Sequence, residues 1–128
     1  MSPRLVPATV HELSRIGLLA SLPGEQLNRL AGRMTREEIP AGTAIVRQGE
    51  EGERFYVVLS GMLNVTQEAI GDRRILRPGD FFGEVALAMH VPRTASVRAV
   101  TPAVVASCDR ETFDEHLRSL FAADAADE

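Results

Sequence analysis

The chain has 128 residues, with 18 acidic and 14 basic side chains, three histidines and one cysteine, for a formal net charge of −4. This length suits one domain with its own core, and the acidic balance does not favour a nucleic-acid-binding surface. A single cysteine excludes an internal disulfide, which fits a reducing compartment such as the cytoplasm. No stretch reaches the roughly 18 apolar residues of a membrane span, so no direct membrane insertion is expected.

Two amphipathic helices are predicted between residues 11 and 34, after an N-terminal tail of residues 1–10. Hydrophobic residues recur there at three- and four-residue spacing, at Leu13, Ile16, Leu19, Leu27, Leu30, Ala31 and Met34. The connection Leu-Pro-Gly-Glu at 22–25 places a proline and an acidic residue where the second helix would begin. We expect both helices to pack on the rest of the domain.

Beyond residue 40 the sequence changes to short β-rich runs separated by glycine turns. The predicted strands cover residues 43–47, 55–59, 62–66, 73–76, 94–100 and 103–108. Turn signals lie between the first four, at 49–52, 60–61 and 70–72. Closely spaced strands with glycine turns are typical of an antiparallel barrel or roll.

The segment 77–100 combines turn, helix and strand signals around two charged side chains. Gly83 permits a close backbone approach because it has no Cβ. A short helix is predicted to begin near Gly83 or Glu84 and to end before Pro92, which disfavours a helical residue at the preceding position. The free N–H groups of its first turn can receive an anion. A phosphate would then lie between this helix and Arg93, with Glu84 accepting hydrogen bonds from sugar hydroxyls.

The run FGEVALAMHVPRTASV, residues 82–97, resembles the phosphate-binding cassette of cyclic nucleotide-binding domains. The family pattern is F-G-E, a few apolar residues, a short linker, then P-R-x-A with serine or threonine and valine, and the sequence matches it without an insertion. The resemblance implies that Glu84 takes the ribose 2′-hydroxyl and that Arg93 takes the cyclic phosphate. It also implies that backbone N–H groups line the anion, those of Gly83, Ala86 and Ala95. A motif of this length and mixed chemistry is far more specific than a lone glycine pattern.

Taken singly, the residues of this motif have ordinary structural explanations. A glutamate in the first turn of a helix usually complements the helix dipole, which is worth about 0.3–1 kcal/mol. An arginine after a proline is usually a solvated surface residue. The joint occurrence of Gly83, Glu84, Arg93 and Ala95 at this spacing favours a cassette-like loop instead.

The resemblance extends to the predicted strands. The run AGTAIVRQGEEGERFYVVLSGML, residues 41–63, looks like the first half of the family's eight-stranded β-roll, with Gly49, Gly52 and Gly61 at its turns. The expected fold is therefore α+β: an eight-stranded antiparallel, jelly-roll-like β-roll with N-terminal helices, a short cassette helix and a C-terminal helix. We expect the cyclic nucleotide-binding domain to span residues 11–121.

Residues 110–121 predict a helix that Asp109 caps, with four hydrophobic side chains on one face: Phe113, Leu117, Leu120 and Phe121. In the family a further helix closes over the purine as a lid. Here only an acidic tail follows, residues 122–128. Either the lid comes from another chain or a missing C-terminal portion, or the base stays open to water. No helix-turn-helix follows either, so the transcription-factor version of the family is not supported.

The residues expected to contact the purine are Val65, Val85 and Ala95. Arg73 and Arg74 lie on the strand before the cassette, and only one can point inward because side chains alternate along a strand. An inward arginine, assigned here to Arg74, could bind N7 or O6 of the purine or could hinder the base. Thr94 could bond a phosphate oxygen or the guanine amino group. Cyclic AMP is preferred over cyclic GMP, but these residues leave both open.

The sequence therefore predicts a sensor module that binds one cyclic nucleotide and switches an attached or partner effector, whose identity it does not reveal. The alternative is a protein-interaction module that keeps the fold without binding a nucleotide. No P-loop, nucleophile elbow or H-E-x-x-H motif is present, so an enzyme is not expected. The histidines show no metal-ligand spacing, so no metal is predicted.

Overall fold

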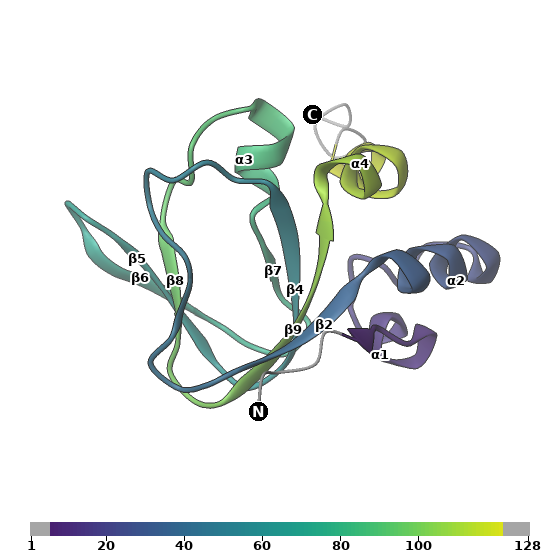
Figure 1. Cartoon of the computed structure of the whole chain (residues 1–128), viewed down its shortest axis with the longest axis horizontal. Coiled ribbons are helices and arrows are strands. Elements are labelled where there is room, and N and C mark those ends of the chain that lie inside the picture. The colour runs from purple at the N-terminus through teal and green to yellow at the C-terminus, as the bar shows by residue number, and fades with distance from the viewer. Residues whose placement is uncertain (1–5, 122–128) are drawn as a thin grey trace.

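The computed structural model describes residues 6–121, which form two antiparallel β-sheets and a group of helices (Figure 1). The strands are β1 (Val6–Pro7), β2 (Thr35–Ile39), β3 (Ala44–Val46), β4 (Arg54–Ser60), β5 (Leu63–Gln67), β6 (Gly71–Leu76), β7 (Phe81–Phe82), β8 (Ser96–Ala99) and β9 (Ala103–Asp109). The helices are α1 (Val10–Ser14), α2 (Gly24–Arg33), α3 (Glu84–Met89) and α4 (Arg110–Thr112), which continues into the π-helical turn η1 (Phe113–Leu117).

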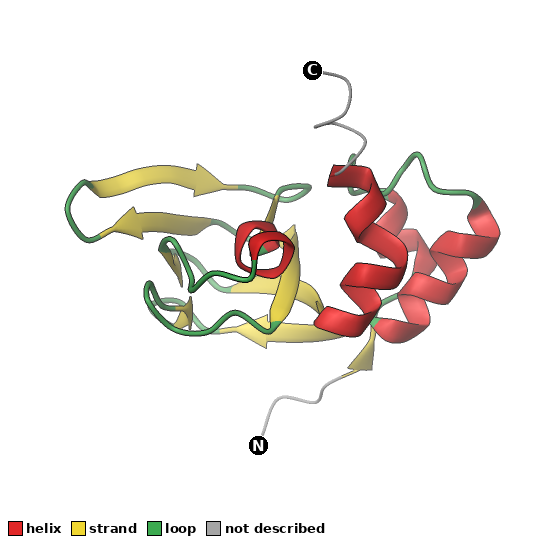
Figure 2. Ribbon diagram, turned by 90° about the horizontal axis from the view of Figure 1, so that it is seen from above, coloured by secondary structure: helices red, strands yellow, loops and turns green. Residues whose placement is uncertain are grey.

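The strands form a five-stranded sheet, in the order β1-β2-β9-β4-β7, and a four-stranded sheet, in the order β3-β8-β5-β6. The helices α1, α2 and α4 lie together on one side of the roll, and the β5–β6 hairpin projects at its other end (Figure 2). This confirms the predicted α+β antiparallel β-roll. The described residues contain nine strands rather than eight, because the two-residue β1 joins the edge of the larger sheet.

Strand β4 separates the two hydrophobic cores of the domain. Because side chains alternate along a strand, Phe55 and Val57 point into a core shared with the helices. Tyr56 and Val58 point into the interior of the roll. All four are buried, which is why this run is continuously apolar instead of alternating with polar residues. The strand therefore positions the site and the helices relative to each other.

The first predicted helix is shorter than its hydrophobic pattern indicates. The helix α1 ends at Ser14, and single turns follow in which Ile16 N donates to Leu13 O at 3.0 Å and Leu19 N donates to Ile16 O at 2.9 Å. The spacing of three residues between these hydrophobic positions fits such i→i+3 turns better than a helix of 3.6 residues per turn. The second predicted helix is confirmed as α2.

Strand β2 was not predicted, because its sequence TREEI carries three charged residues. It pairs along its whole length with β9. Arg36 forms an ion pair with Glu12 of α1, with 2.9 Å between Nε and Oε2. The positive charge of Arg36 therefore has a partner on a neighbouring element. Residues 6–10, placed by prediction in an N-terminal tail, contribute β1 and the first residue of α1.

The predicted C-terminal helix is present from Arg110 to Phe121, with η1 as its middle part. Asp109 caps it as expected: Thr112 N donates to Asp109 Oδ1 at 2.9 Å. The predicted acidic tail, residues 122–128, lies outside the described residues. None of the described helices combines the length and hydrophobicity needed to cross a membrane.

Candidate functional site

The short helix α3 has a glycine as its N-cap and a histidine as its C-cap. Gly83 is its N-cap at φ 96°, a left-handed conformation that glycine adopts without strain. A Cβ at this position would also lie 2.7 Å from Arg93 Nη1. The helix ends at Met89, and its C-cap is His90, which has φ 55° and lies two residues before Pro92. The predicted start and end of this helix are therefore confirmed.

Two arginines of the C-terminal helix hold the other end of α3. Arg110 Nη1 donates to the carbonyl oxygen of Leu87 at 3.0 Å. Arg118 donates to the carbonyl oxygens of Leu87 and Ala88, at 3.2 Å each. These cations satisfy carbonyls that lack partners within the helix and complement the negative end of its dipole. They connect the cassette directly to the helix at 110–121.

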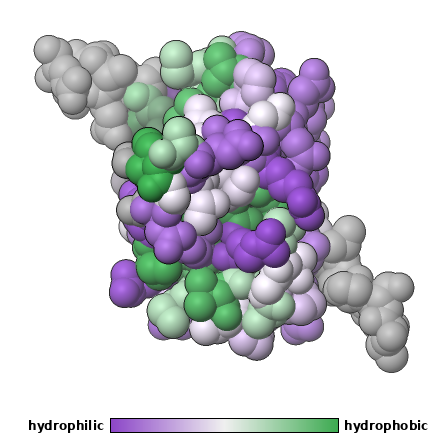
Figure 3. Space-filling model, turned by 90° about the vertical axis from the view of Figure 1, so that its left-hand side faces the viewer, coloured by the Kyte–Doolittle hydropathy of each residue, from purple (hydrophilic) through white to green (hydrophobic). Residues whose placement is uncertain are grey.

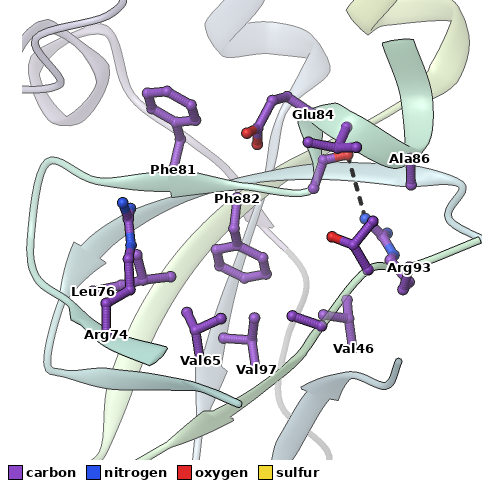
Figure 4. Close-up of a pocket in the computed structure, with 14 residues that line it drawn as sticks. Val46, Val65, Arg74, Leu76, Phe81, Phe82, Glu84, Ala86, Arg93 and Val97 are labelled. Carbon is purple, nitrogen blue, oxygen red and sulfur yellow. Dashed lines mark hydrogen bonds between the residues drawn. The ribbon is translucent and has the colours of Figure 1, made fainter. Parts of the chain in front are cut away.

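A cavity of about 270 Å³ lies between the N-terminal part of α3 and the strands of the roll (Figure 4). All nine residues predicted for the site line it: Val65, Arg74, Gly83, Glu84, Val85, Ala86, Arg93, Thr94 and Ala95. The other lining residues are apolar: Val46, Leu76, Phe81, Phe82 and Val97. The fold thus combines an apolar wall from the strands with charged and small residues from the cassette.

Arg93 is the most buried charged residue of the site, with 7% of its surface exposed. Its Nη2 donates to the carbonyl oxygen of Arg54 at 2.8 Å, and its Nη1 donates to that of Gly83 at 3.4 Å. Burial lowers the pKa of Arg93, although Tyr56 and Glu53 oppose this shift. None of the salt bridges among residues 6–121 includes Arg93. Because buried charges in proteins are usually paired, this position suits an anionic ligand.

The backbone of Arg93 is anchored to the loop between β3 and β4. Arg93 N donates to Glu50 O at 2.8 Å, and Gly49 N donates to Arg93 O at 2.9 Å. The guanidinium carbon also lies 5.9 Å from the centroid of the Tyr56 ring. The loop therefore holds the backbone of Arg93 in place in the absence of a ligand.

Glu84 is the partly buried carboxylate of the site, at the first position of α3. Burial raises the pKa of Glu84, while its own backbone N–H and the nearby Arg74 and Arg93 act in the opposite direction. A carboxylate accepts hydrogen bonds but donates none when ionised. The side chain therefore suits a ligand that offers hydroxyl donors.

Arg74 extends into the cavity from β6, the edge strand of the smaller sheet (Figure 4). Its Cα pairs with that of Val65 on β5, and the register shifts at the next residue. The side chain of Arg73 is not among those described. Arg74 thus lines the cavity, and its contact with a base stays a prediction.

Sequence reasoning missed three residues that shape the position of Arg93. The carbonyl of Arg54 accepts from its guanidinium, and Gly52 lies against the same group. Tyr56 stacks on Phe82, with 4.7 Å between the ring centroids and 4° between the ring planes. Alternation along β4 could have placed Tyr56 inside the roll, but nothing local to Gly52 or Arg54 indicates a contact with residue 93.

The visible face on the side of the β5–β6 hairpin mixes hydrophilic and hydrophobic side chains (Figure 3). Hydrophobic side chains there are interrupted by hydrophilic ones across the described surface. This face therefore does not present one broad apolar area. The apolar residues of the site line the cavity instead.

A sequence model described as the cyclic nucleotide-binding domain matches residues 36–119. The cGMP-dependent protein kinase egl-4 of Caenorhabditis briggsae is 38% identical over 117 residues, which covers 87% of this chain and 16% of the kinase. The cAMP-dependent protein kinase regulatory subunit of Yarrowia lipolytica is 38% identical over 106 residues, which covers 82% of this chain and 28% of the subunit. The chain thus spans less than a third of either relative.

A solved structure of the regulatory domain of Toxoplasma gondii PKA with cAMP has the same fold. It superposes with a TM-score of 0.84 at 28% sequence identity, covering 94% of this chain and 49% of that chain. The sequence match covers most of the described residues, and Gly83, Glu84, Arg93 and Ala95 of the cassette motif all line the cavity. On these grounds the chain belongs to the cyclic nucleotide-binding domain family.

Proposed function

We propose that this chain is a sensor module that binds one cyclic nucleotide in the cavity beside α3 and thereby switches an attached or partner effector. The observation that carries the proposal is the buried guanidinium of Arg93, which lines the cavity and has no carboxylate partner among the described residues. A cyclic phosphate supplies one negative charge and two unesterified oxygens. It would pair with this cation by charge-assisted hydrogen bonds.

The other cavity residues fit the remaining parts of such a ligand. In the proposed pose the backbone N–H groups of Gly83, Ala86 and Ala95 face the phosphate, and Glu84 accepts from the ribose 2′-hydroxyl. Thr94 lies beside Arg93 and offers a hydroxyl to the phosphate or the base. The purine lies against Val65, Val85 and the apolar wall of the roll. No step in this scheme is catalytic, so the proposed activity is binding.

Cyclic AMP is the first candidate ligand. The regulatory subunit of Yarrowia lipolytica belongs by its name to a cAMP-dependent kinase, and the Toxoplasma gondii domain was solved with cAMP. The ligand can switch an effector only as far as it binds one arrangement of the domain more tightly. The contacts of Arg110 and Arg118 with α3 offer a route from the site to the C-terminal helix.

Calorimetric titration of cyclic AMP, then cyclic GMP, tests the proposal on protein stripped of carried-over nucleotide by unfolding and refolding. We expect saturable binding of one nucleotide per chain, with changed hydrogen exchange in residues 110–121. Binding without a change in hydrogen exchange there would support the binding site but contradict the proposed switch. No heat with either nucleotide, from protein shown to be folded, would instead favour a protein-interaction module.

Cyclic GMP is the second candidate, and the position of Arg74 in the cavity wall favours it. A guanidinium only donates hydrogen bonds, so it suits O6 and N7 of guanine, whereas adenine presents an amino donor in place of O6. Arg74→Ala is expected to weaken cyclic GMP binding by about 1–3 kcal/mol and to change cyclic AMP binding much less. Titrations of both nucleotides into the unmodified chain and Arg74→Ala measure the ratio of the two affinities. An unchanged ratio would exclude Arg74 as a base-reading residue.

Binding is expected to weaken in mild acid through Glu84. Because burial raises the pKa of Glu84 in the free protein, a falling pH protonates it earlier than an ordinary glutamate. Ribose hydroxyls that donate to the carboxylate favour its charged form, so binding must release this proton. The affinity should therefore be level above the raised pKa and fall as the pH drops through it.

The matched control for this pH dependence is Glu84→Gln, which keeps an acceptor oxygen but does not titrate. It should bind more weakly than the unmodified chain at neutral pH and should lack the fall in acid. Because both proteins meet the same ligand, any protonation of the base cancels in the comparison. Parallel pH profiles for the two proteins would contradict the assignment of Glu84.

A further inference from the structure

Gly52 lies between β3 and β4, in a loop where glycine is not required by the backbone conformation. Its φ is not in the left-handed range, in contrast to that of Gly49 at 88° and Gly83 at 96°. A turn alone would therefore accept another residue at this position. The reason for a glycine at position 52 has to be the space around it.

That space is filled by the two elements of the phosphate site. An ideal Cβ on Gly52 would lie 2.9 Å from both Cζ and Nε of Arg93, and 2.6 Å from Cβ of Ala86. Non-bonded carbon atoms normally approach to about 3.5–4.0 Å. A methyl group at residue 52 must therefore displace the Arg93 guanidinium, the helix α3, or both.

The surrounding hydrogen bonds limit how far the loop can move away. The carbonyl of Gly52 accepts from Arg110 Nη2 at 3.1 Å. The adjacent Gly49 and Glu50 hold the backbone of Arg93 at 2.9 and 2.8 Å. Because the loop and the backbone of Arg93 are both held by these contacts, the parts that can move are the end of the Arg93 side chain and, at Ala86, the helix α3. A displaced guanidinium would strain its hydrogen bonds to Arg54 O and Gly83 O.

We propose that Gly52 is a positioning residue for the phosphate-binding arginine: because it has no Cβ, it leaves the space that the Arg93 guanidinium occupies. The inference rests on the proposed function for its effect on binding. It extends that function to a residue outside the cassette, 41 positions from Arg93 by their numbers in the chain. A larger residue at position 52 would leave the fold and the cassette sequence unchanged. It would displace the Arg93 guanidinium from the proposed phosphate position.

A double-mutant cycle tests the proposal. Cyclic AMP and cyclic GMP are titrated into the unmodified chain, Gly52→Ala, Arg93→Ala and the double variant, with urea unfolding measured in the absence of nucleotide. Gly52→Ala is expected to weaken binding at least about tenfold. The double variant should bind less than about twofold more weakly than Arg93→Ala alone, because the effects of residues that act through one contact are not additive.

Gly32→Ala in α2 is the matched control, since a Cβ there meets no atom within 4 Å and its φ is ordinary. It should leave the affinity within about twofold of the unmodified chain. Gly52→Ala that binds like the unmodified chain would overturn the proposal. So would losses that multiply in the double variant, because the methyl group would then act through Ala86 or the loop instead of Arg93.

The unfolding data keep the proposal testable if Gly52→Ala is too unstable to titrate. Removing the Arg93 side chain should then restore part of the lost stability to the double variant relative to Gly52→Ala, since only the contact with Ala86 Cβ remains. Equal instability of the two would overturn the proposal. If the unmodified chain binds neither nucleotide, the proposed function fails, and this stability comparison still decides the contact between Gly52 and Arg93.

Discussion

Arg93→Ala is expected to weaken cyclic AMP binding by about 2–5 kcal/mol, which is roughly 30-fold to a few thousand-fold in affinity. Arg93 is 7% exposed, and its guanidinium donates to the carbonyls of Arg54 and Gly83. Its donors are therefore oriented before the ligand binds. Without it the phosphate would be buried with no countercharge, and the desolvation cost of that charge would no longer be offset. Calorimetric titration of both proteins measures the loss.

Arg29→Ala is the matched control for the loss of a positive charge. Arg29 is an exposed residue of α2 whose ion pair is with Glu25, one turn away. Exposed pairs of this kind contribute about 0.3–0.5 kcal/mol, so its removal should leave the nucleotide affinity unchanged. A loss below threefold for Arg93→Ala, in protein that binds with one-to-one stoichiometry, would show that the phosphate is bound elsewhere.

Phe55→Ala is expected to lower the free energy of unfolding by about 3–5 kcal/mol. Phe55 is fully buried in β4 and packs on the C-terminal helix, with its ring centroid 5.4 Å from that of Phe113 and 6.0 Å from that of Phe121. It also lies 6.0 Å from Phe81 of the cavity wall. Truncation leaves a cavity where the sheet, the helix and the site meet. Urea unfolding followed by circular dichroism measures the effect.

Two further variants control for this effect. Phe55→Leu keeps part of the buried volume and should lose clearly less stability than Phe55→Ala. Val100→Ala removes a side chain that is 51% exposed, and surface changes of this kind usually stay within about 0.5 kcal/mol. A loss below about 1 kcal/mol for Phe55→Ala would mean that the aromatic cluster is not tightly packed.

The cassette could be predicted from the sequence because its signals are local. Gly83, the apolar run after it and Pro92 set the start and end of α3 within ten residues. The strand alternation around Phe55 likewise depends only on neighbouring positions. All nine residues predicted for the site, from such patterns and from the family resemblance, line the cavity, although their contacts with a nucleotide stay a proposal.

Elements whose stability comes from distant partners were predicted less well. The charged strand β2 exists because β9 pairs with it and because Glu12 matches Arg36. Leu13, Ile16 and Leu19 are buried as predicted, but single turns rather than one long helix bury them. In both cases the tertiary contact overrides the local preference, which is only a weak prior.

The sequence by itself determined the family, the type of fold and nine of the residues that line the cavity, since a contiguous motif and a period of two carry that information. Only the tertiary structure decided how Arg93 is held. Its guanidinium meets the carbonyl of a residue 39 positions away, and Arg110 reaches Gly52 across 58 positions. The burial that raises the pKa of Glu84 is decided in the same way. Contacts between such distant segments form only after the chain folds, so no local pattern of residues records them.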